Sequence, residues 1–329
     1  MTILVTGGAG FIGSHLCERL IKEDYNLICV DNLTTGLKIT LNSLLKNPRF
    51  KFINHDVVKP LNIKSKVDAI FHLASPASPN HHSKISYLAL PMATMLVNTT
   101  GTLNCLELAK RNHARFLFAS TSEVYGNPLE HPQKESYNGN VSTTSPRAVY
   151  DEAKRFGETI SYYFYRNEKV DVRIARIFNT YGPRMLKADM RMIIKFVTQA
   201  ISGKPLTIYG NGKQTRSLCY IDDMVVGLMR LMFYPNTKGE IINLGSEKEN
   251  TVLQYAQMII KLTGSKSKII FSEPLPENDP LQRRPDISKA KKLLNWKPKT
   301  SLEIGLQKMI NYIYPSSSDL QLAQREKAD

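Results

Sequence analysis

The chain has 329 residues, which is enough for one large domain or two modest ones. Hydrophobic residues make up 42% and charged residues 22%, a composition that excludes a mostly disordered chain. No apolar run reaches about 18 residues, which excludes a membrane-spanning helix. The 44 Lys and Arg against 29 Asp and Glu give a net charge of +15, which favours an anionic partner without distinguishing a nucleotide from a nucleic acid.

The first half of the chain alternates short apolar runs with segments of helical periodicity. We expect strands at 3–6, 27–30, 50–53, 69–72, 116–119 and 170–175, and helices at 11–22, 37–45, 92–111 and 147–166. Strands that alternate with helices indicate βαβ units. The sequence therefore predicts an α/β fold with a Rossmann-type, doubly wound parallel sheet.

The pattern loosens after about residue 180. Helices are expected at 190–202, 222–233, 252–262 and 302–312, with strands at 206–208 and 240–244. This is too little alternation for a second sheet of the same kind. We expect residues 1–180 to form an NAD-binding Rossmann domain, to which some later segments return. Residues 181–314 should form a smaller α/β substrate lobe, and residues 315–329 a disordered polar tail.

A glycine-rich turn follows the first expected strand and opens the first expected helix. Its glycines, Gly7, Gly10 and Gly13, recur at every third position. We expect Gly7 to allow a tight turn, Gly10 to let the backbone approach a pyrophosphate, and Gly13 to allow close packing of helix on strand. Because free amides at the helix start would face the anion, the motif predicts a dinucleotide site.

An acidic residue indicates which dinucleotide binds. Asp31 closes the second expected strand, 18 residues after Gly13. A carboxylate there can accept hydrogen bonds from the hydroxyls of the adenosine ribose, and it would repel a 2′-phosphate. The sequence therefore favours NAD over NADP.

Tyr150 and Lys154 form a Tyr-x-x-x-Lys motif at the start of the helix expected over 147–166. Residues four apart share a helix face, so the ammonium group should lie near the phenol. A nearby positive charge favours the phenolate, and we expect it to lower the pKa of Tyr150 from about 10 toward neutrality. Such a tyrosine can take a proton from a sugar hydroxyl while a hydride leaves for nicotinamide.

A polar triplet, Thr121-Ser122-Glu123, follows the strand expected over 116–119. Ligands of open α/β sheets bind at the carboxyl ends of the strands, so the triplet should lie near the nicotinamide. The order of glycine turn, strand-end Ser/Thr and Tyr-x-x-x-Lys resembles the extended short-chain dehydrogenase/reductase family. This resemblance runs from residue 1 to about residue 313.

Within that family the triplet is similar to that of the UDP-glucuronic acid decarboxylases, which make UDP-xylose. The 4,6-dehydratases typically carry an Asp-Glu pair here, because elimination of water needs a general acid beside a base, and Ser122 replaces that Asp. The 4-epimerases typically carry small residues without the Glu. The stretches 72–79, 145–152, 175–185, 214–216 and 279–286 also resemble the decarboxylases.

The resemblance implies an NAD-dependent decarboxylation of UDP-glucuronate. C4 of the sugar is oxidised with Tyr150 as the base, the resulting β-keto acid loses CO₂, and the hydride returns to give UDP-xylose. Thr121 and Ser122 are implied to hydrogen-bond the C4 oxygen or the carboxylate. Glu123 and Arg216 are implied to handle the carboxylate and the protonation of C5.

The resemblance also implies the residues that contact each ligand. Cofactor contacts are expected from Gly7, Gly10, Phe11, Ile12, Gly13, Asp31, Asn32, Thr35, Asp56, Val57, Leu73, Tyr150 and Lys154. Substrate contacts are expected from Asn179, Arg191, Tyr209, Gln214, Arg216 and Arg283. Tyr209 and Gln214 should line the nucleoside side, and the Arg283 guanidinium should pair with the diphosphate.

Three segments depart from the pattern of these decarboxylases. They usually read Ser-Pro-Pro-His-Tyr where this chain has Ser78-Pro79-Asn80-His81-His82, so a histidine replaces the tyrosine. The segment 91–98 lacks their usual lysines, and Met190 stands where a glycine is usual. These departures leave a different sugar or nucleotide specificity open.

Neither a metal site nor a disulfide framework is indicated. His72, His81 and His82 have no carboxylate or cysteine at a matching spacing, so we expect no metal. The four cysteines are widely separated and form no Cys-x-x-Cys pair, which is typical of buried free thiols.

Two other readings of the function stay open. One is a 4-epimerase or a 4,6-dehydratase on the same scaffold. The other is a non-catalytic relative that binds a nucleotide or RNA. Basic residues are scattered rather than clustered with aromatic ones, so we expect no nucleic-acid partner.

The assembly and the location of the protein can also be predicted. The helices expected at 92–111 and 147–166 carry more apolar surface than one lobe needs, and in the resembled family two such helices pair as a four-helix bundle. We therefore expect a homodimer. No signal or transit region precedes the first expected strand, so we expect a cytoplasmic location.

Overall fold

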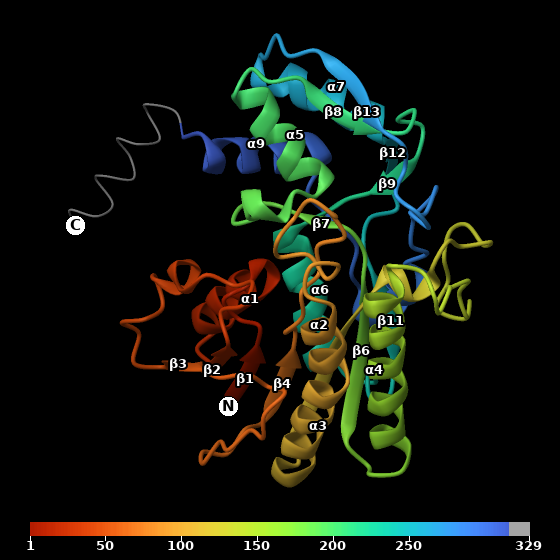
Figure 1. The fold of residues 1–329 in the computed structure, drawn as a ribbon. Helices are drawn as coiled ribbons and strands as arrows, with labels where there is room; N and C mark the ends of the chain where they lie inside the picture. Colours follow the sequence, from red (N-terminus) through yellow and green to blue (C-terminus); the bar gives the residue numbers. More distant parts are fainter. Residues whose placement is uncertain (316–329) are drawn as a thin grey trace.

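A seven-stranded parallel sheet forms the centre of the molecule, as the computed structural model of residues 1–315 shows (Figure 1). The strand order is β11-β6-β5-β4-β1-β2-β3, and every neighbouring pair is parallel. The strands are β1 (Thr2–Thr6), β2 (Asn26–Asp31), β3 (Phe50–Asn54), β4 (Ala69–His72), β5 (Arg115–Thr121), β6 (Asp171–Ile177) and β11 (Ile241–Leu244). The expected Rossmann-type sheet is confirmed. The tail expected at 315–329 lies, apart from its first residue, outside the described residues.

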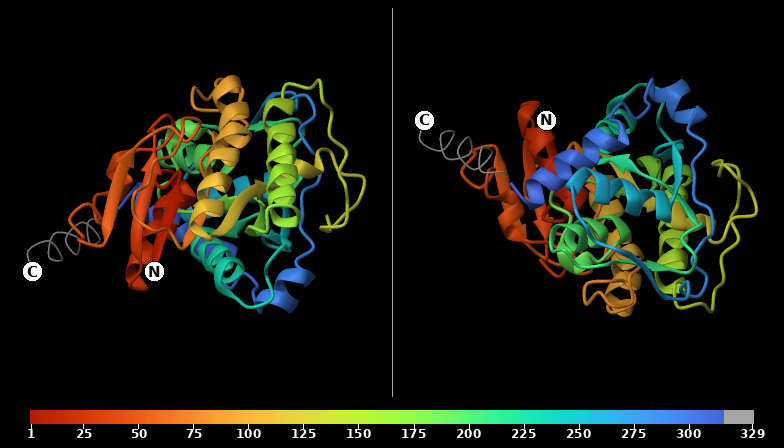
Figure 2. Two further views of the ribbon diagram at one scale, coloured as in Figure 1. Left: turned by 90° about the horizontal axis from the view of Figure 1, so that it is seen from below. Right: turned by 90° about the horizontal axis from the view of Figure 1, so that it is seen from above.

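Helices cover both faces of this sheet. The helices α2 (Pro91–Asn98), α3 (Thr100–Asn112) and α4 (Ala148–Arg166) lie on one face, and α6 (Ile221–Phe233) lies on the other (Figure 2). The first helix, α1 (Phe11–Lys22), packs on β1, β2 and α6. A short helix, α8 (Ser288–Leu294), packs against β11. The later elements α6 and β11 therefore pack with the first part of the fold.

Two of the expected helices are wrong in their extent. Residues 37–45 form a short 3-10 helix, η1 (Lys38–Leu41), followed by turns. There the Thr40 hydroxyl donates to the carbonyls of Leu37 and Ala9, at 2.8 and 3.0 Å, and so competes with helical hydrogen bonding. The helix expected at 92–111 is divided at Thr99, whose backbone is not helical (φ −107°, ψ −81°). Two adjacent β-branched residues favour this interruption.

A second part of the chain lies above the carboxyl ends of the strands (Figure 1). It contains the helices α5 (Met192–Ile201), α7 (Val252–Thr263) and α9 (Leu302–Ile313). Its strands pair in twos: β7 (Thr180–Tyr181) with β10 (Cys219–Tyr220), β9 (Thr215–Ser217) with β12 (Glu249–Thr251), and β8 (Leu206–Tyr209) with β13 (Ile269–Glu273). Two further 3-10 helices are η2 (Ser122–Tyr125) and η3 (Lys187–Asp189).

The apolar core is continuous between these two parts. One cluster of buried side chains contains Val5 of β1 and Leu16 of α1. The same cluster contains Phe196 and Trp296 from the later part of the chain. A second cluster lies between the sheet and the α3 side, around Phe116 and Leu106. None of the helices within residues 1–315 is long and apolar enough to cross a membrane.

Candidate active site

Two adjoining cavities open at the carboxyl ends of the strands. The larger has a volume of about 480 Å³ and the smaller about 170 Å³. All of the expected cofactor residues line the larger one: Gly7, Gly10, Phe11, Ile12, Gly13, Asp31, Asn32, Thr35, Asp56, Val57, Leu73, Tyr150 and Lys154. Residues far apart in the sequence thus form one continuous surface.

The glycine turn has room for a phosphate where it faces this cavity. A Cβ atom on Gly7, whose φ is +70°, would lie 2.7 Å from the Cα of Ala74, and one on Gly13 would lie 2.1 Å from the Gly7 carbonyl oxygen. A Cβ atom on Gly10 would meet only that carbonyl oxygen, at 3.2 Å. Within residues 1–315 no side chain caps the start of α1, so its first amide groups are open to an anion. The turn therefore fits a dinucleotide.

Asp31 links the end of β2 to the glycine turn. Its carboxylate accepts hydrogen bonds from the backbone N–H groups of Ala9, at 2.9 Å, and Leu33, at 2.8 Å. Burial raises the pKa of this carboxyl, and the two N–H groups oppose that rise. The side chain lines the larger cavity, where a ribose could reach it.

Tyr150 and Lys154 lie one turn apart at the start of α4, and both are buried. The expected lowering of the Tyr150 pKa is wrong for the ligand-free protein. Burial raises the pKa of Tyr150, and a contact with Thr121 only partly offsets this. Burial also lowers the pKa of Lys154 to about 7, and its ammonium group donates to the Ala119 carbonyl at 2.7 Å. Desolvation of both groups therefore outweighs the attraction that the spacing suggested.

Glu123 lies in the same cavity, immediately after β5, and two arginines hold it. Arg147 Nη2 lies 2.5 Å and Arg283 Nη2 3.1 Å from Glu123 Oε2. Burial alone would raise the pKa of Glu123, but the charges of Arg283 and Arg147 outweigh it and lower the pKa to about 2. Glu123 is therefore an ionised carboxylate in this structure.

The ion pairs continue into the smaller cavity through Asp279. Its carboxylate oxygens lie 3.3 Å from Arg147 Nη1 and 2.7 Å from Arg216 Nη2. Arg216 thus approaches Glu123 through Asp279 and Arg147 and not directly. Sequence reasoning missed Arg147 and Asp279 as site residues, although both stand in the stretches that carried the resemblance, at 145–152 and 279–286.

An aromatic neighbour of Tyr150 was also missed. The Tyr87 ring stacks on the Tyr150 ring, with centroids 4.7 Å apart and planes 6° apart. Both rings line the larger cavity. No motif marks Tyr87, since its partner lies 63 positions further along the chain.

The residues expected to bind substrate are only partly brought together. Asn179 and Arg191 line both cavities, whereas Tyr209, Gln214 and Arg216 line the smaller one. The Oε1 atom of Gln214 is buried without a hydrogen-bond partner among residues 1–315. Arg283 lines neither cavity, because it lies behind Glu123 and donates to the carbonyls of Ser122 and Gly126.

Comparisons with known proteins agree with this architecture. A solved UDP-glucuronic acid 4-epimerase from Bacillus cereus, in complex with UDP-glucuronic acid and NAD, is 32% identical with a TM-score of 0.82, over 95% of this chain and 99% of that one. A solved UDP-glucose 4-epimerase from Thermotoga maritima, with UDP-glucose, is 29% identical with a TM-score of 0.84, over 95% and 98%.

Curated sequences give a higher similarity. UDP-glucuronic acid decarboxylase 1 from Danio rerio is 50% identical over 94% of this chain and 72% of its own length. UDP-glucuronic acid decarboxylase 6 from Arabidopsis thaliana is 50% identical over 94% and 88%. The family profile described as GDP-mannose 4,6 dehydratase matches residues 4–309. The chain therefore belongs to the NAD-dependent epimerase and dehydratase family that this profile describes, and within it to the UDP-glucuronic acid decarboxylases.

Proposed function

We propose that this protein converts UDP-glucuronate to UDP-xylose, with NAD as its redox cofactor. The observation that carries the proposal is the position of Glu123, which shares the larger cavity with Tyr150 and follows a serine rather than the aspartate that a dehydratase would use. The 50% identity to the decarboxylases, against 32% to the solved UDP-glucuronic acid 4-epimerase, supports it.

The chain's own residues prepare the sugar for oxidation at C4. The glycine turn and Asp31 would hold the dinucleotide, and Lys154 would hold the nicotinamide ribose. When bound, NAD⁺ supplies an acceptor for the C4 hydride and a positive charge. Tyr150, in contact with Thr121, takes the proton of the C4 hydroxyl. Because burial raises the pKa of Tyr150, its deprotonation depends on charge that arrives with the ligands.

Oxidation at C4 makes the C6 carboxylate part of a β-keto acid. The C5–C6 bond then breaks, CO₂ leaves, and the electron pair moves to the C4 oxygen as an enolate. By pairing with Arg147 and Arg283, the ionised Glu123 keeps these arginines from binding the substrate carboxylate, whose charge is lost as neutral CO₂ forms. Since Glu123 carries no proton, it does not protonate C5 itself: a proton taken up from solvent reaches C5 as the enolate returns to the C4 ketone, and Tyr150 returns its proton to the C4 oxygen on reduction. Reduction of the ketone at C4 completes a reaction with no net redox change.

The variant Glu123→Gln tests this role. We expect the rate of CO₂ release from UDP-glucuronate to fall by about 10²-fold or more, because Arg147 and Arg283 lose their shared ionic partner and can instead bind and stabilise the substrate carboxylate. Substrate-dependent NADH absorbance should still appear, because oxidation at C4 does not need the carboxylate of Glu123. CO₂ and NADH are measured on the same purified protein.

Glu152→Gln is the matched control. Glu152 lies on α4, and the one ion pair that its carboxylate forms within residues 1–315 is with Arg155, at 3.6 Å, so this variant should release CO₂ at the wild-type rate. An unchanged rate in Glu123→Gln would remove Glu123 from the mechanism. If the wild-type protein made UDP-galacturonate without releasing CO₂, the protein would instead be a 4-epimerase.

The proposed working form is a cytoplasmic homodimer, paired through a four-helix bundle. Apolar side chains on α2, α3 and α4 are exposed: Met92 60%, Leu96 39%, Leu103 37%, Phe156 50% and Tyr163 51%. Phe156 and Tyr163 are seven residues apart on α4, a spacing that keeps them on one helix face, whereas Leu96 and Leu103 lie on the successive helices α2 and α3. All four cysteines are buried free thiols, which supports a reducing compartment.

A further inference from the structure

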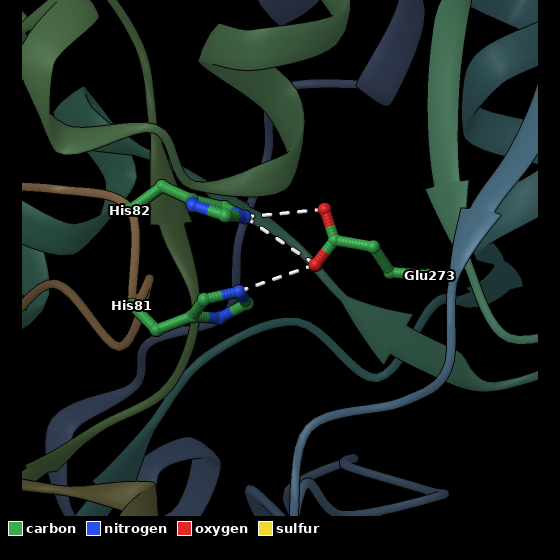
Figure 3. Close-up of side chains that lie close together, drawn as sticks. All are labelled: His81, His82 and Glu273. Carbon is green, nitrogen blue, oxygen red and sulfur yellow. Dashed lines mark hydrogen bonds and ion pairs between the residues drawn. The ribbon is translucent and has the colours of Figure 1, made fainter.

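Two histidines and a glutamate converge outside the proposed reaction site (Figure 3). His81 and His82 belong to the segment after β4, and Glu273 is the last residue of β13. His81 Nε2 lies 3.2 Å from Glu273 Oε2, and His82 Nε2 lies 3.1 Å from Oε1 and 3.3 Å from Oε2. The two imidazole rings lie side by side, with centroids 4.0 Å apart. The fold thus supplies the carboxylate that the sequence near the histidines lacks.

These separations fit the edges of a metal coordination sphere. Zinc binds imidazole nitrogen and carboxylate oxygen at about 2.0–2.2 Å, so that ligand atoms of a tetrahedral site lie about 3.3 Å apart. The three contacts above are 3.1–3.3 Å, and the three ligand atoms lie within 4.8 Å of one another. We propose that His81, His82 and Glu273 bind one divalent transition-metal ion, with water as the fourth ligand.

The backbone that carries the two histidines is held in place without a metal. Asn80, which is buried, accepts from the His82 backbone N–H at 2.9 Å and donates from its side chain to the Met190 carbonyl at 2.8 Å. Ser78, also buried, donates to the Asp189 carbonyl at 2.6 Å. Since these bonds fix the turn in advance, an ion need not order the segment in order to bind.

Glu273 is directed to the same point by an irregularity in its strand. The pairing of β8 with β13 shifts register between Phe271 and Glu273, and such a bulge redirects a side chain. The Gly210 backbone N–H donates to the Glu273 carbonyl at 2.7 Å, which holds the strand end in place. Figure 3 shows the carboxylate extending from β13 toward both rings.

Hydrogen bonds without a metal are the alternative account of this cluster. The side chains are 40%, 48% and 40% exposed for His81, His82 and Glu273, and exposed pairs of this kind stabilise a fold little. The positive charge of Lys195, which interacts with Glu273, favours this alternative because it would weaken the binding of a cation. Imidazole ligands favour zinc, copper and nickel over magnesium and calcium, so the proposal predicts a selective site.

A metal here would join two segments at the edge of the smaller cavity. His81 lines that cavity together with Tyr209, the last residue of β8. An ion would therefore fasten the segment after β4 to the β8–β13 pair. Unfolding must release such an ion, so binding should raise the melting temperature of the protein.

Calorimetric titration of the full chain with Zn²⁺ tests the site. We expect one ion per chain in the wild type, and affinity at least about tenfold lower in His82→Tyr and in Glu273→Gln. His82→Tyr restores the residue that similar decarboxylases usually carry. His131→Ala is the control, because His131 pairs with Glu249 elsewhere, at 3.0 Å, and its loss should leave the affinity unchanged.

Two further measurements make the result decisive. Co²⁺ should give the visible absorption of a four-coordinate ion in the wild type and lose it in Glu273→Gln. Zn²⁺ should raise the melting temperature of the wild type and of His131→Ala but not of His82→Tyr, while Mg²⁺ should raise neither. Absence of stoichiometric Zn²⁺ binding, or equal affinity in all variants, would overturn the proposal and leave hydrogen bonds as the account of the cluster.

Discussion

The glycines of the turn are needed for different reasons, although they are evenly spaced in the sequence. Gly13 has no room for a side chain, because a Cβ atom would lie 2.1 Å from a backbone oxygen. Gly10 has room within the protein, and its missing side chain leaves space for a ligand. Gly13 is therefore required by folding and Gly10 by binding.

Replacing each glycine by alanine separates these tasks. Gly13→Ala should lower the free energy of unfolding by about 1–3 kcal/mol, because the backbone must shift. Gly10→Ala should change it by less than about 1 kcal/mol but weaken NAD binding clearly. Urea unfolding and titration with NAD measure the two effects. Equal loss of stability in both variants would contradict the division of tasks.

Burial of Lys154 makes the stability of the ligand-free protein depend on pH. Its pKa is lowered to about 7 from 10.5, so between these values the unfolded chain carries a proton that the folded protein lacks. The free energy of unfolding therefore rises with pH across this window, by at most about 1.4 kcal/mol per pH unit.

The variant Lys154→Met should lack this contribution. Its stability relative to wild type should be highest near neutral pH and should decrease as the pH rises toward about 9, since only the wild type gains from deprotonation. Urea unfolding of both proteins at several pH values measures this. Parallel pH profiles would show that Lys154 keeps its proton in the folded protein.

The position of α4, which carries Tyr150 and Lys154, depends on a buried ion pair. Arg176 on β6 binds both carboxylate oxygens of Glu158 on α4, at 2.9 and 2.7 Å, and Glu158 also accepts from Ser120 on β5 at 2.5 Å. The helix is thus joined to both strands beneath it.

A double-mutant cycle tests this connection. Arg176→Met alone should cost about 3–5 kcal/mol, because it leaves the buried Glu158 charge unpaired. The double variant Arg176→Met with Glu158→Leu should be less destabilised than the single one. Unfolding of the four proteins gives the coupling energy. A double variant whose loss equals the sum of the single losses would show that the pair is not coupled.

The elements were predictable from the sequence where local patterns decide them. Every expected strand of the central sheet is present, because a buried parallel strand is a short apolar run, and α1 begins and ends as expected. The division of α2 from α3 depends on the Thr99 backbone, and η1 depends on contacts of Thr40 with the glycine turn. Periodicity does not record such contacts.

The candidate site, too, was predictable from the sequence where local motifs mark its residues. The glycine turn, Asp31 and the Tyr-x-x-x-Lys pair are motifs, and they line one cavity. The ion pairs of Glu123 with Arg147 and Arg283 join residues 24 and 160 positions apart, which no spacing rule connects. The predicted direction of the Tyr150 pKa shift was wrong because the pKa depends on burial. A sequence motif does not show how deeply a side chain is buried.

At the scale of the whole molecule, the exposed apolar faces of α3 and α4 predict the assembly. We expect light scattering of the wild type to give the mass of a dimer. The charge introduced by Leu103→Lys, and likewise by Phe156→Lys, should shift the protein toward the monomer. Leu129 is 82% exposed but lies in a loop outside these helices, so Leu129→Lys should remain dimeric. A monomeric wild type at micromolar concentration would contradict the expectation.

The continuous core limits how this scaffold can be recombined. Side chains of the sheet, of α1 and of the later chain pack in one cluster, so a cut near residue 180 would divide that cluster, with Val5 before the cut and Phe196 after it. A chimera that joins the first 180 residues to the remainder of a distant homologue would place core side chains of mismatched volume against one another. New sugar preferences are therefore better engineered by point changes around the smaller cavity than by exchanging lobes.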